Sequence, residues 1–332
     1  FENCKKSMMP LKSRPHVLLI IVIAVAIALP LIDSNPYHID VLVTAGIFML
    51  LALGLNVIVG FAGILHLGFA AQYAVGAYTY ALLNLHWQLP FWPGLLISGI
   101  IGAATAMLLA FPALRLGGDY LAIVTLGAGE IVRIVLNNWD SVTGGPNGLL
   151  GIAHPSLAVA GYDFSVRSTP YYYLLLVLIL LSAWCLNRIA KSRIGRAWLA
   201  LREDELAATC MGVNPAWAKL LAFAIGGFMA GLAGCIFAAK QGSVSPDSFD
   251  FILSVMVLAM VVLGGLGSIR GALLGALVLS LLPELFRSVE VYRMLLFGLA
   301  MIVMMLFRPQ GLIEASHTRE DFRRDEPDPP QP

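Results

Sequence analysis

The stretch NRIAKSRIGRAWLALREDELAATCMGVNPAWAK, residues 187–219, is a polar interruption between long apolar segments of the chain. Its start is basic and its middle is amphipathic, so it predicts a cytoplasmic loop that presents a short helix to another protein. One side of that helix would be formed by small and apolar residues, namely Ala200, Leu201, Ala207, Ala208 and Met211. Gly212 supplies a natural stop for the helix.

The composition of the chain indicates an all-α polytopic membrane protein. Of its 332 residues, 59% are hydrophobic and 12% are charged, whereas soluble domains have about 45–50% apolar and about 25% charged residues. The mean hydropathy is +0.83. The net charge of +1 says nothing about partners, because the positions of the charges matter more in a membrane protein. Nothing in the sequence supports nucleic-acid binding.

Long apolar runs predict about ten transmembrane helices, since a bilayer core of about 30 Å needs about 20 helical residues. The predicted spans are Val17–Ile32, Val41–Val59, Gly63–Leu85, Phe91–Leu114, Tyr120–Leu136, Tyr171–Leu186, Leu220–Ala239, Phe251–Ile269, Ala272–Phe286 and Val291–Phe307. The first span, with its basic flank, also fits a cleaved signal peptide. The fifth contains Glu130 and Arg133 and also fits an inward-facing or broken helix.

The distribution of Lys and Arg predicts that both termini and the loop 187–219 are cytoplasmic, because these residues resist translocation. Six spans then precede the loop and four follow it. The outward connections carry acidic residues instead: Asp33, Asp40, Asp140, Asp163, Asp247 and Asp250, with Arg167 as the basic exception. This topology divides the chain into a cytoplasmic segment 1–16, a transmembrane domain 17–308 with an external loop 137–170, and a cytoplasmic tail 309–332. We expect the Pro-rich end of the tail to be disordered.

Polar side chains inside the apolar segments are candidates for a substrate pathway. A charge near the bilayer centre costs about 2.5–3.5 kcal/mol, so such residues need partners or water. Asn56, His66 and Gln72 cluster around glycines, which predicts a kinked or unwound helix whose backbone groups line a cavity. Glu130 and Arg133 share one helical face, where they can neutralise each other. Hydrogen bonding between helices, without substrate contact, is the alternative for His66, Gln72 and the charged pair.

Glycine spacing predicts close packing between helices. Two series recur every fourth residue: Gly267, Gly271 and Gly275, and Gly227 and Gly231. Residues 57–63, VIVGFAG, also resemble residues 261–267, VVLGGLG, and His66 or Arg270 follows three residues later. An internal repeat and coincidence both explain this likeness.

The external loop contains a turn-rich cluster that cannot continue a helix: Thr143, Gly144, Gly145, Pro146, Asn147 and Gly148. A docking surface, a lid and a solvated connector are all compatible with this cluster.

Signatures of catalysis and of metal binding are not found in the sequence. The four cysteines form no CxxC pair and are predicted to be buried small hydrophobes. The six histidines show no ligand spacing, so we expect no metal site. The chain has neither a G-x-S-x-G elbow nor a G-x-x-x-x-G-K-[ST] phosphate loop. It is therefore expected to bind no cofactor, and any ATP must be hydrolysed by a partner.

The chain resembles the LivM-type permeases of bacterial branched-chain amino acid ABC importers in a series of long blocks. They are GLNVIVGFAGILHLGFAAQYAVGAY (54–78), GGDYLAIVTLGAGEIVRIVLNNWDSVTGGPNGL (117–149), GRAWLALREDELAATCMGV (195–213), AGLAGCIFAAKQGSVSPDSF (230–249), VLGGLGS (262–268) and LLPELFR…YRMLLFGLAMIVMMLFRPQGL (281–312). The resemblance implies a permease subunit in the bacterial inner membrane. It also implies a second, LivH-type permease as partner, two cytoplasmic ATPases that hold ATP and Mg²⁺, and a periplasmic binding protein that delivers leucine, isoleucine or valine.

The loop helix resembles the EAA coupling motif of importer permeases, in which a glycine follows E-A-A. Ala207, Ala208 and Gly212 match the motif, whereas Glu205 is displaced by one residue. The resemblance implies that these residues, with Arg202, dock in an ATPase cleft. ATP binding would then move the loop helices and open the permease pair outward, and hydrolysis would reset it.

Three alternatives to branched-chain amino acid import stay open on the sequence alone. A permease of the same superfamily that carries urea or another small amide would share most of these blocks. A secondary transporter driven by protons through Glu130 or His66 and a passive channel belong to other classes.

Overall fold

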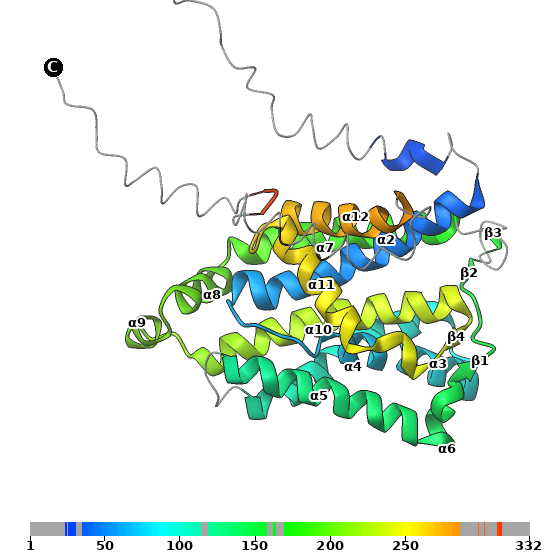
Figure 1. Cartoon of the computed structure of the whole chain (residues 1–332), viewed down its shortest axis with the longest axis horizontal. Helices are drawn as coiled ribbons and strands as arrows, with labels where there is room; N and C mark the ends of the chain where they lie inside the picture. The colour runs from blue at the N-terminus through cyan, green and yellow to red at the C-terminus, as the bar shows by residue number, and fades with distance from the viewer. Residues whose placement is uncertain are drawn as a thin grey trace, which may run out of the picture.

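The computed structural model describes residues 24, 26–30, 35–113, 119–157, 162–163, 169–285, 298, 302 and 311–313. They form a bundle of α-helices (Figure 1). The longer helices are α2 (Pro36–Leu55), α3 (Phe69–Trp87), α4 (Phe91–Ala113), α5 (Asp119–Asn138), α7 (Thr169–Ala190), α8 (Arg193–Glu203), α10 (Pro215–Gln241), α11 (Phe251–Gly264) and α12 (Ile269–Leu285). The shorter elements are η1 (Asn56–Phe61), α6 (Asp140–Thr143), η2 (Gly145–Asn147), β1 (Leu149–Leu150), β2 (Ser156–Leu157), β3 (Tyr162–Asp163), α9 (Glu205–Cys210), β4 (Ser243–Val244) and η3 (Pro246–Phe249).

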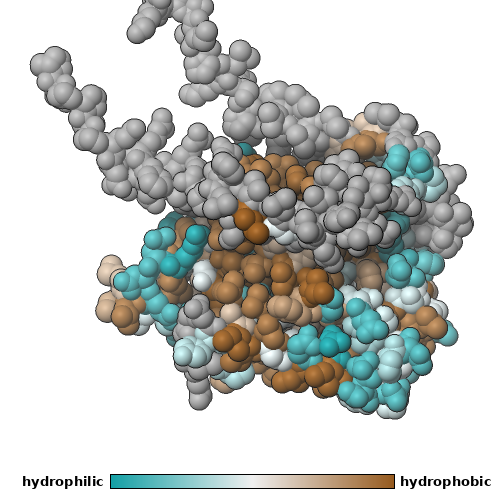
Figure 2. Space-filling model, viewed as in Figure 1, coloured by the Kyte–Doolittle hydropathy of each residue, from teal (hydrophilic) through white to brown (hydrophobic). Residues whose placement is uncertain are grey.

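The two predicted loops lie at opposite ends of the bundle. Helices α8 and α9, from residues 187–219, project from one end, whereas α6 and the strands lie at the other (Figure 1). The strands are short antiparallel pairs, β1 with β4 and β2 with β3. Hydrophobic residues dominate the middle of the visible face, and hydrophilic residues gather towards the ends (Figure 2). This distribution is that of a protein whose middle lies in a bilayer.

Side-chain caps define where several helices begin. Asn35, Ser192, Asp204 and Asn214 each accept a hydrogen bond from a backbone N–H in the first turn of the following helix, and Asp250 does the same for α11. These caps satisfy N–H groups that have no partner within the helix.

Glycines hold the centre of the bundle together, as their spacing predicts. Helix α10 crosses α3 and α4 so closely that a Cβ atom on Gly76 would lie 2.5 Å from Gly231 Cα. A Cβ atom on Gly102 would lie 2.6 Å from the Gly227 carbonyl oxygen. Gly271 and Gly275 likewise face the backbone of α11. Such contacts allow dispersion forces to join helices where lipid provides no hydrophobic drive.

The structure does not confirm the predicted count of ten spans. Among the described residues, six helices are long and apolar enough to cross a membrane: Pro36–Phe61, Phe91–Pro112, Tyr120–Asn138, Thr169–Ala190, Pro215–Gln241 and Pro246–Gly264. The predicted span 272–286 corresponds to α12, whose apolar part, Ile269–Leu282, is shorter. The predicted span 63–85 corresponds to α3, but that helix begins only at Phe69. Residues 63–68 form a non-helical connection.

The ends of the chain fall mostly outside the described residues. This applies to the predicted segment 1–16, to most of the predicted spans 17–32 and 291–307, and to the tail 309–332. Three residues of the tail are described, and two of them pair with α11. Leu312 N–H donates to the Leu263 carbonyl oxygen at 2.9 Å, and Ile313 N–H donates to that of Gly264 at 3.0 Å.

Candidate functional site

The kinked or unwound helix predicted around Asn56, His66 and Gln72 is present as an interruption between α2 and α3. Helix α2 passes into the π-helix η1, in which Ala62 N–H donates to the Val57 carbonyl oxygen at 3.2 Å. The chain then leaves the helix and returns, largely buried, to the start of α3. π-Turns of this kind are frequent at functional positions of helices.

Asn56 joins this interruption to a second one between α11 and α12. Its Oδ1 accepts a hydrogen bond from Gly267 N–H at 2.9 Å, across 211 residues of sequence. A Cβ atom on Gly60 would lie 2.5 Å from Gly267 N. The two similar glycine-rich segments, 57–63 and 261–267, therefore meet in space. Asn56 Nδ2 is buried and has no hydrogen-bond partner among the described residues.

His66 and Gln72 form a separate buried pair at the start of α3. His66 Nε2 lies 3.3 Å from the end of the Gln72 amide. With its nitrogen towards α3, that amide donates to the Gly68 and Phe69 carbonyl oxygens at 2.9 Å each. The imidazole packs edge-on against Phe69 and Phe223 at centroid distances of 5.9 and 5.1 Å. These contacts hold the two side chains against each other at the start of α3, whereas His66 Nδ1 is buried and has no hydrogen-bond partner among the described residues.

Glu130 and Arg133 form an ion pair on α5, as their spacing predicts. Arg133 Nε lies 2.9 Å from Glu130 Oε2, and the two side chains are 36% and 31% exposed, respectively. The pair is therefore neutral as a unit but open on one side. Its exposed side must meet water or another protein, because lipid cannot solvate two charged groups.

Glu130 also lines a narrow cleft between α3, α5 and the start of α11. The cleft is lined by Gly68 and Ala70 at the start of α3, and by Asp250 and Ser254. Ser254 Oγ accepts the Ala70 N–H at 2.9 Å. Among the sequence-predicted pathway residues, only Glu130 lines this cleft. Its free space of about 10 Å³ holds about one water molecule.

Hydroxyl groups that the sequence reasoning missed fix the start of α3. Besides Ser254, Thr125 of α5 accepts the Leu67 N–H at 3.2 Å through Oγ1. Thr125 and Ser254 are both buried. The available signal was a single Ser or Thr within each of the apolar helices α5 and α11, which is too weak to identify a partner 58 or 184 residues away.

The loop 187–219 contains two helices where the sequence predicts one. Asp204 ends α8 and caps α9, since its Oδ1 accepts the N–H groups of Leu206 and Ala207 at 2.8 and 3.0 Å. Gly212, at a φ of +87°, follows the end of α9 as predicted. Glu205 forms an ion pair with Lys219, with 2.6 Å between Oε1 and Nζ.

The predicted apolar side of the loop helix needs correction. Ala208 is only 4% exposed and packs within the chain, so it does not share an open face with Ala207 and Met211. The break at Asp204 rotates the two halves of the loop relative to the single helix that the pattern assumed. Leu206 and Met211, 80% and 85% exposed, form the open apolar surface of α9.

The external cluster is a set of structural turns. Thr143 is buried, and its Oγ1 donates to the carbonyl oxygens of Leu136 and Trp139 at 2.6 and 2.8 Å. Gly144 and Gly145 adopt φ values of +73° and +58°, and Asn147 ends the following 3₁₀ turn. These contacts fix the turns of the cluster, and its role as a docking surface, a lid or a solvated connector stays a prediction.

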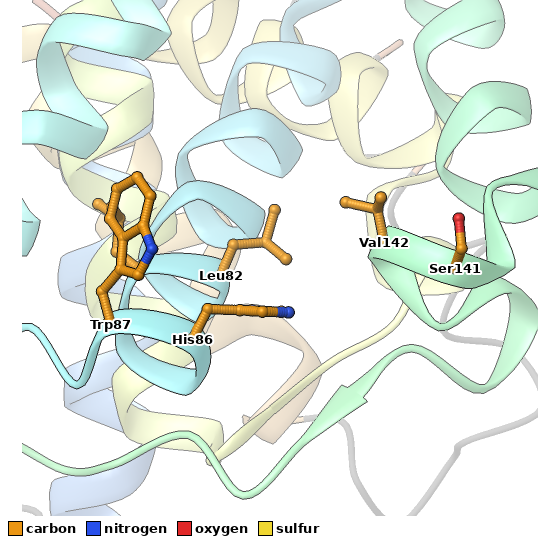
Figure 3. A pocket seen from close by; sticks show the side chains of 6 residues that line it. Leu82, His86, Trp87, Ser141 and Val142 are labelled. Atoms are coloured by element: carbon orange, nitrogen blue, oxygen red, sulfur yellow. The ribbon is translucent and has the colours of Figure 1, made fainter.

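A wider cleft of about 270 Å³ opens beside the external cluster. Leu82, His86 and Trp87 of α3 face Ser141 and Val142 of α6 across it (Figure 3). None of the sequence-predicted site residues lines this cleft.

The described residues contain no group of three or more His, Cys, Asp or Glu side chains placed to hold a metal ion. The cysteine prediction is right for Cys235, which is buried, and wrong for Cys210, which is exposed on α9. Cys185 is partly buried, and Cys4 lies outside the described residues.

Comparison with known proteins gives a consistent result. A family model described as the permease component of branched-chain amino acid transport systems matches residues 37–305. The chain is 46% identical over 320 residues to the high-affinity branched-chain amino acid transport system permease protein LivM of Escherichia coli K12, covering 90% of this chain and 75% of that protein. It is 45% identical to LivM of Salmonella typhimurium with the same coverage.

A second type of permease is also similar. The LivH permease protein of the high-affinity branched-chain amino acid transport system of Escherichia coli K12 is 28% identical over 284 residues, with 80% of this chain and 91% of that protein covered. No solved structure matches the chain. On the family match and the LivM relatives, the chain belongs to the family of permease components of branched-chain amino acid transport systems.

Proposed function

We propose that this protein is the membrane-spanning permease subunit of an ATP-driven importer that moves leucine, isoleucine and valine into the bacterial cytoplasm. The observation that carries the proposal is its similarity to the LivM permeases over 90% of the chain. The protein would lie in the inner membrane with both termini and the loop 187–219 in the cytoplasm. It would carry out no reaction itself, and transport would follow from alternating access of the permease pair.

The second permease would cover α5. Helices α5 and α7 are exposed to the same extent, because only 17% of the most apolar stretch of each is buried within the chain. The exposed residues of α7 include Val177, Leu181 and Trp184, which suit lipid. Helix α5 instead carries the pair of Glu130 and Arg133, about one-third exposed, which suits a protein or an aqueous pathway. The similarity of the chain to both LivM and LivH supports a pair of related permeases.

The narrow cleft beside α5 has the chemistry that a zwitterionic, apolar amino acid needs. The start of α3 presents the positive end of a helix dipole to a carboxylate. Glu130 and Asp250 present negative charge to an ammonium group, and Leu126 is among the apolar lining residues. In the described state the cleft is closed, so an amino acid would enter only when α5 moves away from α3.

The ATPases would act on α9. A helix that exposes Leu206 and Met211 at the end of the bundle has an apolar surface that a protein cleft can cover. ATP and Mg²⁺ would be bound by those partners. A periplasmic binding protein would dock at the opposite end of the bundle, where α6 and the strands lie (Figure 1).

Leu206→Asp is expected to weaken docking of the ATPases. A charge placed in the centre of an apolar interface should lower ATP-dependent uptake about ten-fold or more, because central contacts dominate binding energy. The measurement is leucine uptake together with the amount of ATPase that copurifies with the permease. Leu206→Met keeps the apolar surface and serves as the matched control. Normal copurification of the Leu206→Asp protein would place the docking surface elsewhere.

Reconstitution tests the proposed function as a whole. The chain, its second permease, the two ATPases and the binding protein, placed together in liposomes, should accumulate radiolabelled leucine against a gradient when ATP is supplied. The chain alone should not. Accumulation by the chain alone would contradict an ATP-driven importer. Stimulation of ATP hydrolysis by urea, and not by leucine, isoleucine or valine, would assign the complex to small amides.

A further inference from the structure

Arg202, near the end of α8, connects the loop 187–219 to the helix interruption between α2 and α3. Its Nη1 donates a hydrogen bond to the Gly60 carbonyl oxygen at 2.6 Å, across 142 residues of sequence. Its aliphatic stem lies on Gly63, where a Cβ atom would come within 2.7 Å of Arg202 Cγ. Gly63 also has a φ of +70°, so the backbone and the arginine both favour glycine at this position.

The Gly60 carbonyl needs a partner from outside its own helix. The chain leaves the π-helix after Phe61, so the last carbonyl groups of the turn find no N–H in a following helical turn. Guanidinium is permanently charged, and hydrogen bonds from charged donors are shorter and stronger than those between neutral groups. Arg202 thus caps the turn from the loop side.

Gly60 lies directly against the second interruption. It faces Gly267, which lies in the turn between α11 and α12, and Asn56 of the same π-helix accepts the Gly267 N–H. One arginine of the loop is therefore bonded to the point at which two interrupted helices meet.

The helices α8 and α9 meet at Asp204, and both are bonded to the start of α10. Asp204 ends one and caps the other. Trp198 of α8 is buried and donates through Nε1 to the carbonyl oxygen of Ala218 in α10 at 2.7 Å, and Glu205 of α9 pairs with Lys219 of α10. A force applied to α9 is thereby passed to α8. From there the Arg202 hydrogen bond leads to the interruption at Gly60.

We propose that Arg202 is a positioning residue that transmits displacement of α8 and α9 to the helix contact of Gly60 with Gly267. The inference rests on the proposed function, in which ATPases displace the loop. When the loop moves, the Gly60 carbonyl follows the guanidinium, and Asn56 and the turn between α11 and α12 follow Gly60. Arg202 touches neither ATP nor the amino acid in this role.

The test uses the complete complex in liposomes, with uptake of leucine and hydrolysis of ATP measured on the same sample. In Arg202→Gln, uptake per ATP hydrolysed should fall about ten-fold or more. The glutamine side chain is shorter and uncharged, so it cannot form the strong hydrogen bond that the guanidinium forms. Hydrolysis should stay within about two-fold of the unmodified complex, since Leu206 and Met211 still form the apolar surface of α9. Arg202→Lys keeps the charge and should recover part of the ratio. Arg196→Gln changes an exposed arginine of the same helix and should leave the ratio unchanged.

Gly63→Ala tests the same contact from the other side. The added methyl group would displace the arginine stem and, at a φ of +70°, also strain the backbone, so the comparison uses uptake per ATP hydrolysed in assembled complex, which should fall as in Arg202→Gln. The double variant should be no worse than either single one, because both changes break one contact. An equal fall of uptake and hydrolysis in Arg202→Gln, or an unchanged ratio, would overturn the proposal.

Hydrogen exchange separates this proposal from the proposed function. A non-hydrolysable ATP analogue should change the exchange of backbone amides in residues 56–64 of the complex, and Arg202→Gln should abolish that change. This readout does not depend on which solute is carried. If the unmodified complex fails to take up leucine, isoleucine and valine, the substrate assignment fails and the exchange result still decides the role of Arg202. Identical exchange in the two complexes would overturn the proposal.

Discussion

Gly231→Leu is expected to prevent the chain from reaching its folded state. Gly231 lies where α10 crosses α3 and α4, and a Cβ atom on it would touch the Ser98 carbonyl oxygen and lie 3.0 Å from Gly99 Cα. Gly76 of α3 approaches the same residue from its own side. All these neighbours are backbone atoms, so they cannot turn aside as a side chain can. The cost should be about 3 kcal/mol or more, at the upper end of overpacking changes.

The measurement is the yield and thermal unfolding temperature of the detergent-purified chain. Gly127→Leu is the matched control, because Gly127 lies within α5 and a Cβ atom there would meet nothing within 4 Å. Replacing that glycine should leave stability unchanged or raise it by up to about 1 kcal/mol, since leucine is the better helix former. Normal yield and stability of the Gly231→Leu protein would contradict the close crossing of α10 with α3 and α4.

Features that depend on neighbouring residues could be predicted from the sequence. Six of the predicted spans correspond to long apolar helices, because each carries its own hydropathy signal. The pairing of Glu130 with Arg133 and the stop at Gly212 follow from spacing within one helical turn. The small-residue series on α10 likewise indicated a close helix crossing.

Features that depend on distant residues could not be predicted. Asn56, His66 and Gln72 were grouped as pathway candidates around one unwound helix, but Asn56 binds Gly267, whereas His66 and Gln72 contact each other. The hydrogen bond from Arg202 to Gly60 joins two segments with no shared pattern. Local periodicity records which face of a helix is apolar, and it does not say which distant backbone group will meet a given side chain.

The loop shows how one residue changes a local prediction. The pattern predicts Ala207 and Ala208 on one helical side with Leu201, but Asp204 caps a new helix and breaks the period there. Ala208 then points into the protein and Leu206 points out. A substitution at Ala208 would consequently test the packing of the loop, whereas one at Leu206 tests its outer surface.

Removing one charge of the Glu130–Arg133 pair is expected to harm the protein more than removing both. Glu130→Gln leaves Arg133 without its carboxylate on a helix that the proposed function places against a second permease. A stranded charge in a buried pair costs about 3–5 kcal/mol. Both side chains of this pair are about one-third exposed and therefore partly solvated. We expect a cost of about 1–2 kcal/mol when one charge is removed. The single variant should therefore assemble poorly with the second permease and transport slowly.

Adding Arg133→Gln should recover part of the loss, because the unpaired cation is then gone and two neutral amides can bond to each other. Assembly is measured by copurification of the two permeases, and transport by leucine uptake normalised to assembled complex. Arg133→Gln alone completes the double-mutant cycle, and like Glu130→Gln it should lower both assembly and uptake.

The same cycle decides whether Glu130 has a direct part in transport. If assembly recovers in the double variant but uptake per complex does not, the carboxylate is needed beyond neutralising Arg133. Its place in the narrow cleft beside Asp250 would then make it the group that meets the ammonium of the amino acid. An uptake rate that also varied with an imposed proton gradient in the absence of ATP would instead favour a proton-coupled transporter. Equal recovery of assembly and uptake would show that the pair serves only to place two neutralised side chains on the open face of α5.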